Sequence, residues 1–107
     1  MAMSRMMQEV PSADVVIRNP THFAVALRYD QDKNRAPQVV AKGKDYIALR
    51  IVKIAEENDV YVTEDPPLAR LLYSTVDIGR EIPVELYNAV AEILTVVYKI
   101  KNKSLHA

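Results

Sequence analysis

The tetrapeptide Asn19-Pro20-Thr21-His22 combines residue types that allow a reaction of the backbone with itself. In ordinary deamidation, the backbone N–H that follows an asparagine attacks the side-chain carbonyl, and proline has no N–H to do this. The reaction left open is attack of the Asn19 side-chain nitrogen on its own main-chain carbonyl. That attack closes a five-membered succinimide, breaks the Asn19–Pro20 bond and releases Pro20 as a new amino terminus. The chemistry available here is therefore a single-turnover self-cleavage.

The neighbours of Asn19 suit this reaction, which needs a rigid frame and a proton for the leaving amine. Pro20 fixes its own φ and disfavours the helical region for Asn19. Histidine titrates near neutrality, so His22 is the candidate for proton transfer, and the Thr21 hydroxyl is the candidate to hold the carbonyl oxygen or a water. An Asn-Pro pair is usually an inert turn, however, and these residues alone leave both interpretations open.

Short apolar and β-branched segments on either side of the tetrapeptide predict the strands that hold it. Residues 13–19 and 22–30 are the two flanking strands, and 38–42 and 60–63 are two more. Residues 23–27 are apolar at every position, which predicts a strand covered on both faces. A sheet with helices on both sides follows.

Helical signals fill the rest of the chain. Asp45 is the predicted N-cap of a helix that Asn58 ends, and Asp65 with Pro66 predicts the start of a short helix over 67–73. The last helix begins near Pro83 and carries an apolar stripe formed by Leu86, Val90, Ile93, Val97 and Ile100. The predicted fold is a single α/β domain with a small mixed four-stranded sheet surrounded by helices, spanning 13–107, and residues 1–12 are the predicted connecting arm.

Composition excludes several functional classes. The chain has 107 residues, a net charge of zero and a pI near 6.7, so nucleic-acid binding is not expected. With no cysteine and only two histidines, neither a disulfide nor a metal site is predicted. Phosphate loops, nucleophile elbows and zinc-protease motifs are missing from the sequence, so we expect no cofactor and no turnover enzyme. No apolar stretch is long enough to cross a bilayer, and we expect this piece to be soluble.

Four segments of the chain, between about Met6 and Lys101, resemble the cytoplasmic domain of the FlhB-type export-switch family of flagella and injectisomes. They are VPSADVVIRNPTHFAVALRYD, APQVVAKGKDYIALRI, EDPPLARLLY and IPVELYNAVAEIL. The resemblance implies self-cleavage between Asn19 and Pro20, with Thr21 and His22 completing the motif, and two pieces that remain together as one domain. The PPLAR and AVAEIL runs favour the flagellar branch over the injectisome branch.

The resemblance also implies a role and partners. Family members change the class of exported substrate from rod and hook type to filament type, at the cytoplasmic face of the inner membrane, and a membrane portion precedes the domain. The implied partners are other export-gate components, exported flagellar subunits and the hook-length control protein. The remaining alternatives are an injectisome paralogue with the same switch and a small ligand-binding α/β domain with an inert Asn-Pro turn.

The implied docking residues for early substrates are Ala36, Pro37, Ala91 and Leu94. Ala91 and Leu94 lie beside the main stripe of the last helix, so they either face outward or form a second row of the core. On the first alternative, a charge at Leu94 weakens docking and leaves the fold intact.

Overall fold

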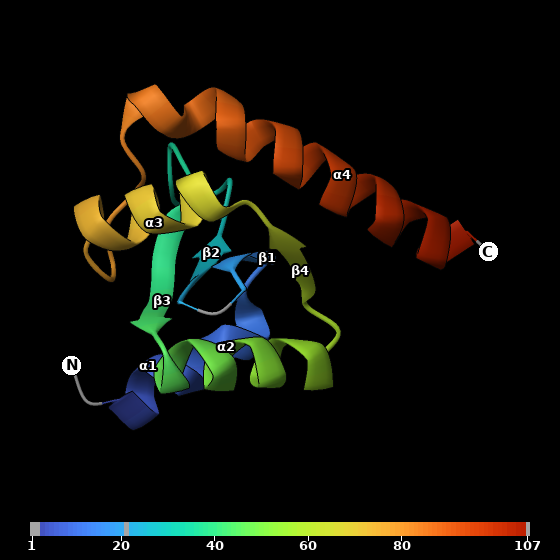
Figure 1. The fold of residues 1–107 in the computed structure, drawn as a ribbon. Helices are drawn as coiled ribbons and strands as arrows, with labels where there is room; N and C mark the ends of the chain where they lie inside the picture. The colour runs from blue at the N-terminus through green and yellow to red at the C-terminus, as the bar shows by residue number, and fades with distance from the viewer. Residues whose placement is uncertain (1–2, 21, 107) are drawn as a thin grey trace.

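A mixed four-stranded sheet lies between two pairs of helices in the computed structural model, which describes residues 3–20 and 22–106. In Figure 1, α1 and α2 cover one face of the sheet, and α3 and α4 cover the other. The elements follow the chain in the order α1 (Met3–Glu9), η1 (Val10–Ser12), β1 (Val15–Asn19), β2 (Phe23–Arg28), β3 (Gln38–Lys44), α2 (Tyr46–Glu57), β4 (Tyr61–Glu64), α3 (Pro66–Thr75), η2 (Val84–Leu86) and α4 (Tyr87–His106). This confirms the predicted α/β class and the predicted four-stranded sheet.

The strand order in the sheet is β3-β2-β1-β4. β1 pairs with β2 in antiparallel fashion and with β4 in parallel fashion, and β2 pairs with β3 in antiparallel fashion. β1 is therefore an inner strand with hydrogen-bonded neighbours on both sides.

β2 contributes to both layers of the core. Val25 and Leu27 pack in the cluster under α3 and α4, whereas Ala24 and Ala26 pack in the cluster under α1 and α2. All four are fully buried. The prediction of a strand covered on both faces is confirmed, because successive side chains of a strand point to opposite faces.

The cap residues of α2 and α3 stand where the sequence predicts them, and one of them works differently. Asp65 accepts a hydrogen bond from the backbone N–H of Leu68 at 3.3 Å, and Asn58 ends α2. Asp45 precedes α2, but its side chain makes no capping bond. Its φ of 53° turns the chain sharply from β3 into α2, and its backbone N–H donates instead to the carbonyl oxygen of His22 at 2.8 Å.

The segment expected as a connecting arm packs into the domain over its described part. Met6, Met7 and Val10 are buried in the cluster that α2 also covers. The folded unit therefore includes α1 and η1, because α1 packs against β3 and η1 packs against α2.

The predicted stripe on α4 is wrong at its C-terminal end. Val90 and Val97 are fully buried, whereas Ile93 is half-buried and Ile100 is 43% exposed. Leu94, at 4% exposure, replaces Ile93 in the buried line. Figure 1 shows the reason for the exposed end, since α4 extends past the sheet and leaves its last turns without a surface to cover. None of the helices within the described residues is long and apolar enough to span a membrane.

Candidate functional site

Asn19 and Pro20 lie at the turn between β1 and β2. Asn19 is the last residue of β1 and stands directly opposite Phe23, the first residue of β2. The backbone N–H of His22 donates to the carbonyl oxygen of Asn19 at 2.9 Å, which closes the turn. Pro20 and His22 are exposed, Asn19 is half-buried, and Thr21 lies outside the described residues. The structure thus brings Asn19, Pro20 and His22 together in one tight turn.

The hydrogen bond from His22 falls on the carbonyl that the predicted reaction attacks. A donor on a carbonyl oxygen makes its carbon a better electrophile and stabilises the negative charge that develops on the oxygen during attack. Because the donor is a backbone N–H, this contribution is built into the turn and does not depend on the His22 side chain.

The side chain of Asn19 lies on the face of the sheet that α3 covers. Val15 and Ile17 belong to the cluster under α3 and α4, and Asn19 follows them at the spacing of two that keeps side chains on one face. Phe23 packs against the same cluster. Asn19 and Phe23 are therefore side-by-side neighbours on one face, at the edge of a packed core.

Hydrogen bonds from two other elements hold the backbone around the turn. The N–H of Asp65 donates to the carbonyl oxygen of Arg18 at 3.1 Å, and the Arg18 guanidinium pairs with Glu64 at 3.2 Å. On the other side, the N–H of Asp45 holds the carbonyl oxygen of His22. The residues before and after the Asn19–Pro20 bond are thus fixed to the ends of β4 and β3, which gives the rigid frame that the reaction requires.

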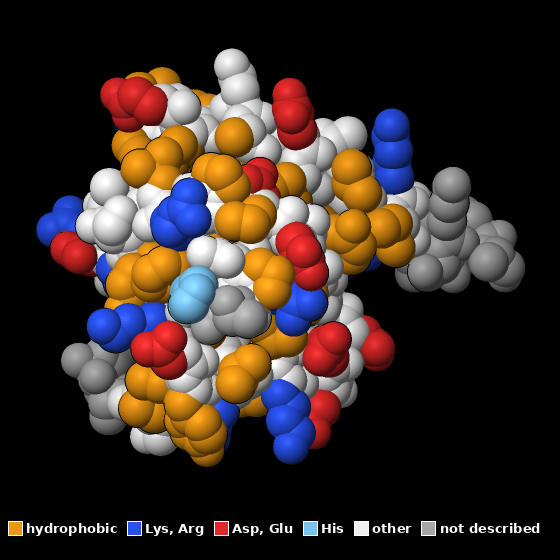
Figure 2. All heavy atoms as spheres, in the orientation of Figure 1, with side chains coloured by type: hydrophobic (Ala, Val, Ile, Leu, Met, Phe, Trp, Pro, Cys, Tyr) orange, Lys and Arg blue, Asp and Glu red, His pale blue; other side chains and the backbone are white. Residues whose placement is uncertain are grey.

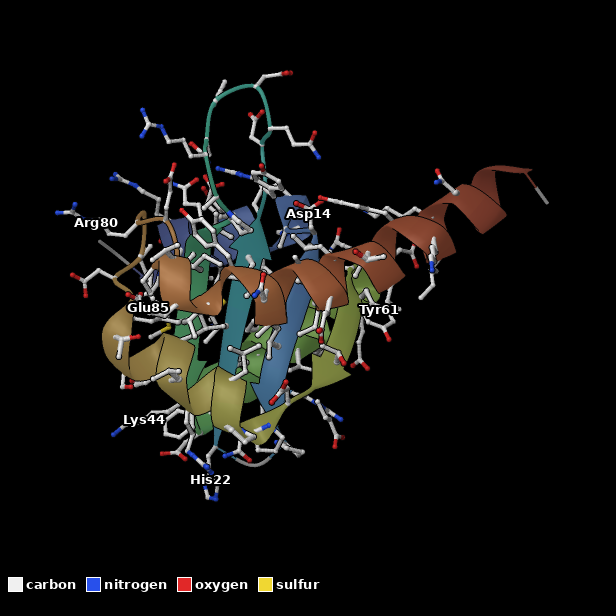
Figure 3. All side chains as sticks on the ribbon, turned by 90° about the horizontal axis from the view of Figure 1, so that it is seen from above. Asp14, His22, Lys44, Tyr61, Arg80 and Glu85 are labelled. Carbon is white, nitrogen blue, oxygen red and sulfur yellow. The ribbon has the colours of Figure 1, made fainter. Side chains whose placement is uncertain are left out.

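His22 projects into solvent from this end of the molecule. In Figure 3 its side chain points away from the sheet, at the same end as Lys44. The imidazole is exposed, with its ring centroid 6.3 Å from that of Phe23. An exposed imidazole beside the turn can exchange protons with water and pass one to an amine released there.

The four residues expected to dock substrates line one pocket. This pocket has a volume of about 160 Å³ and lies between the loop before β3 and the first turns of α4. Ala36, Pro37 and Leu94 are buried, whereas Ala91 is exposed. Ala91 therefore faces outward, as the first alternative expects. Leu94 belongs to the core, as the second alternative expects, and it also lines the pocket. The alternative that Leu94 faces outward is wrong, since its side chain is almost completely buried, and a charge there is now expected to destabilise the fold.

Sequence reasoning missed three further residues of the same pocket, namely Tyr29, Arg35 and Tyr87. Arg35 directly precedes Ala36, and Tyr87 lies four residues before Ala91 on the same helix face, so helical spacing offered a signal for Tyr87. Tyr29 directly follows β2, and only the folded chain brings it to the pocket.

Charged side chains of both signs are mixed with apolar ones on the surface that Figure 2 shows. Within residues 3–20 and 22–106, no group of three or more potential ligands is placed to hold a metal ion.

Comparison with known proteins gives the same family at the level of sequence. Residues 1–97 match the family described as FlhB HrpN YscU SpaS. The chain is 58% identical to the flagellar biosynthetic protein FlhB of Bacillus subtilis over 103 residues, which are 96% of this chain and 29% of that protein. Identity to FlhB of Escherichia coli K12 is 55% over 100 residues, which are 94% of this chain and 26% of that protein. The chain thus spans about a quarter of the length of these relatives.

Solved structures share the fold. The cytoplasmic domain of FlhB from Shewanella putrefaciens superposes with a TM-score of 0.92 at 41% identity, covering 98% of this chain and 81% of that one. A variant of the EscU C-terminal domain, with asparagine replaced by aspartate, gives a TM-score of 0.82 at 35% identity over 86% of this chain and 98% of that one. Other EscU variants change the proline after that asparagine and a histidine three positions beyond the asparagine, the spacing of Asn19, Pro20 and His22. The chain belongs to the FlhB HrpN YscU SpaS family of export proteins.

Proposed function

We propose that this chain is the self-cleaving domain of a flagellar export-apparatus component and that it cuts itself between Asn19 and Pro20. The observation that carries the proposal is the hydrogen bond of 2.9 Å from the His22 N–H to the Asn19 carbonyl oxygen, at a turn fixed to β3 and β4. Identity of 58% and 55% to flagellar FlhB proteins, against 35% to EscU, favours the flagellar branch.

The reaction is an exchange of one carbon–nitrogen bond for another. The Asn19 side-chain nitrogen bonds to the Asn19 main-chain carbon, and the bond from that carbon to the Pro20 nitrogen breaks. The proton lost by the amide is balanced by the proton gained by the proline amine, and in this proposal the His22 imidazole carries it. In the same proposal the Thr21 hydroxyl holds the Asn19 carbonyl oxygen or a water molecule by a hydrogen bond. The products are a succinimide at residue 19 and a free amino terminus at Pro20.

The two pieces, of 19 and 88 residues, stay together because the cut follows an inner strand. Val15, Val16 and Ile17 are fully buried, and their burial contributes about 1.5–3 kcal/mol each. The hydrogen bonds of β1 to both β2 and β4 add to this attachment.

The proposed biological role is inferred from membership of the family. Cleavage switches the exported substrate from rod and hook subunits to filament subunits, together with other export-gate components and the hook-length control protein. Early substrates dock on the pocket lined by Ala36, Pro37, Ala91 and Leu94. In the complete protein a membrane portion precedes α1 and anchors the domain at the cytoplasmic face of the inner membrane.

The proposal is tested by comparing the wild-type chain with Asn19→Ala. We expect two bands of wild-type protein on a denaturing gel, one peak on native size exclusion, and a single uncut mass for Asn19→Ala with an unchanged circular dichroism spectrum. An Asn19→Ala protein cut before Pro20 contradicts the succinimide mechanism. A wild-type protein that stays whole contradicts self-cleavage and leaves the turn inert, as in a small ligand-binding domain.

A further inference from the structure

We propose that Tyr73 on α3 and Lys42 on β3 are positioning residues for the cut, which they promote by holding the Phe23 ring against the side chain of Asn19. The inference rests on the proposed self-cleavage. It assigns a role in that reaction to two residues that lie 23 and 54 positions beyond Asn19 in the chain.

The first step is the pairing of Asn19 with Phe23. The two residues are opposite each other in the β1–β2 register, and both side chains lie on the face under α3. Cβ atoms of directly opposite residues in an antiparallel pair are about 4.5–5.5 Å apart. The Phe23 ring is therefore the cross-strand wall beside the Asn19 side chain, and its position limits the rotamers that Asn19 can adopt.

The second step is the contact that fixes this wall. The Tyr73 ring packs on the Phe23 ring, with centroids 4.8 Å apart and planes inclined at 37°. Such tilted aromatic pairs stabilise by more than their buried area alone. Tyr73 belongs to α3, which is capped through Asp65 and whose neighbouring Leu72 is fully buried. The Phe23 ring is thus held from a rigid helix rather than from the turn itself.

The third step is the attachment of Tyr73 by Lys42. The Lys42 ammonium donates to the carbonyl oxygens of Tyr73 at 2.8 Å and of Val76 at 2.9 Å, and it lies 5.2 Å from the centroid of the Tyr73 ring. A cation here supplies hydrogen bonds to carbonyl oxygens at the C-terminal end of α3, and its charge interacts favourably with the helix dipole. Lys42 pairs with Val25 across β3 and β2, two residues from Phe23. One side chain therefore joins the sheet, the end of α3 and the ring that holds Phe23.

This arrangement bears on the rate of the cut because the nucleophile is the Asn19 side chain. Attack requires a side-chain rotamer that brings the Asn19 amide nitrogen close to the Asn19 main-chain carbonyl carbon. Every other rotamer that Asn19 populates lowers the fraction of molecules that can react. A wall on one side of Asn19 removes competing rotamers before the reaction begins. Loss of that wall is expected to slow the cut and leave the residues of the turn unchanged.

The experiment measures the cutting rate by pulse-labelled cell-free synthesis, followed by a chase and a denaturing gel. We expect Tyr73→Ala to slow the cut by about tenfold or more, and Tyr73→Phe to restore it to about the wild-type rate. Lys42→Met keeps the aliphatic chain and removes the cation, and its rate is expected between the two. Tyr73→Leu, which retains apolar volume without the ring, serves if Tyr73→Ala fails to fold.

The matched control is Tyr98→Ala. Tyr98 is another half-buried tyrosine that packs on the same core cluster, but it lies on α4. We expect it to lower the unfolding temperature and leave the cutting rate near that of the wild type. A wild-type rate in Tyr73→Leu and Tyr73→Ala overturns the inference, and so does equal slowing in Tyr98→Ala. Either result leaves the proposed function standing as long as the wild-type chain is cut and Asn19→Ala is not.

Discussion

The carbonyl oxygen of Asn19 and the backbone N–H of His22 are joined by a hydrogen bond of 2.9 Å, which spans the Asn19–Pro20 bond. The motif histidine therefore has two separable parts. Its backbone N–H holds the carbonyl that the proposed reaction attacks, and its side chain is exposed. Substitutions at this position can separate the two contributions.

His22→Ala keeps the backbone donor and removes only the imidazole. We expect cleavage to slow by about 10²-fold, the usual lower range for loss of a general acid or base, and the pH dependence of the rate to flatten. His22→Pro removes the N–H as well and is expected to be slower still. Intact-mass time courses between pH 5 and pH 9 measure both effects. An unchanged rate in His22→Ala reduces the side chain to a structural role.

Pro20→Ala restores the N–H that deamidation needs and loosens the torsions on both sides of the bond. The cut is expected to slow, and a fraction of Asn19 is expected to become aspartate or isoaspartate. Pro20 is exposed, so the fold should tolerate the change. Peptide mapping detects the modified residue. Rapid cutting of Pro20→Ala with no deamidation goes against the assigned role of proline.

Association of the two pieces depends on the burial of β1. We expect the cut protein to elute as one peak without denaturant, because Val15, Val16 and Ile17 are fully buried between neighbours on both sides. Ile17→Ala removes about 2–5 kcal/mol of this attachment. It is expected to release the 19-residue piece at a lower urea concentration than the wild type. Separation of wild-type pieces on a native column refutes the association.

Ala91 and Leu94 line the same pocket, but their burial separates their predicted effects. Ala91 is exposed, so Ala91→Asp is expected to weaken binding of an early-substrate peptide at a stability cost of under about 1 kcal/mol. Leu94→Asp places a charge in the core and is expected to cost about 3 kcal/mol or more. Peptide titration and urea unfolding measure the two quantities.

Ala89→Asp is the matched control for docking. Ala89 is exposed on α4, and the pocket-lining residues do not include it. The same change there should leave peptide affinity unaltered. Equal losses of affinity in the Ala89 and Ala91 variants would show a general effect of charge on α4, and the pocket would lose its assigned role.

Tyr98 predicts a dependence of stability on alkaline pH. Burial raises the pKa of its hydroxyl above 10.0, and the negative charge of Asp14 raises this pKa further. A raised pKa in the folded state means that the folded chain holds this proton more tightly than the unfolded chain. The associated stability is present below about pH 10 and is lost as the pH rises through the folded pKa. Tyr98→Phe should therefore flatten the fall in unfolding free energy above pH 10, as measured by urea titrations.

Local signals in the sequence were enough to predict most of the elements that frame the turn. The β-branched run of β1 and the continuous apolar run of β2 predicted two strands joined at Asn19-Pro20, and the Asp65-Pro66 pair predicted the start of α3. These predictions succeeded because the signal for each element lies within that element.

The sequence was less informative where distant segments meet. The burial of Met6 and Met7 depends on the space between β3 and α2, and no period within α1 indicates it. The exposure of Ile100 depends on where the sheet ends under α4. The contact of Tyr73 with Phe23 joins residues 50 positions apart, and it too required the folded chain.

The position of β1 between an antiparallel and a parallel neighbour has a mechanical consequence. Hydrogen bonds between strands run roughly across the strand direction, so tension along β1 loads its two ladders in shear. All of these bonds then resist at once, whereas peeling would break them one after another. After a cut at Asn19, force applied to the N-terminal side of β1 would pass into the rest of the domain through these two ladders, and also through α1, which contacts β3. A domain cut at Asn19 would therefore keep a connection that resists force where the covalent one has been lost.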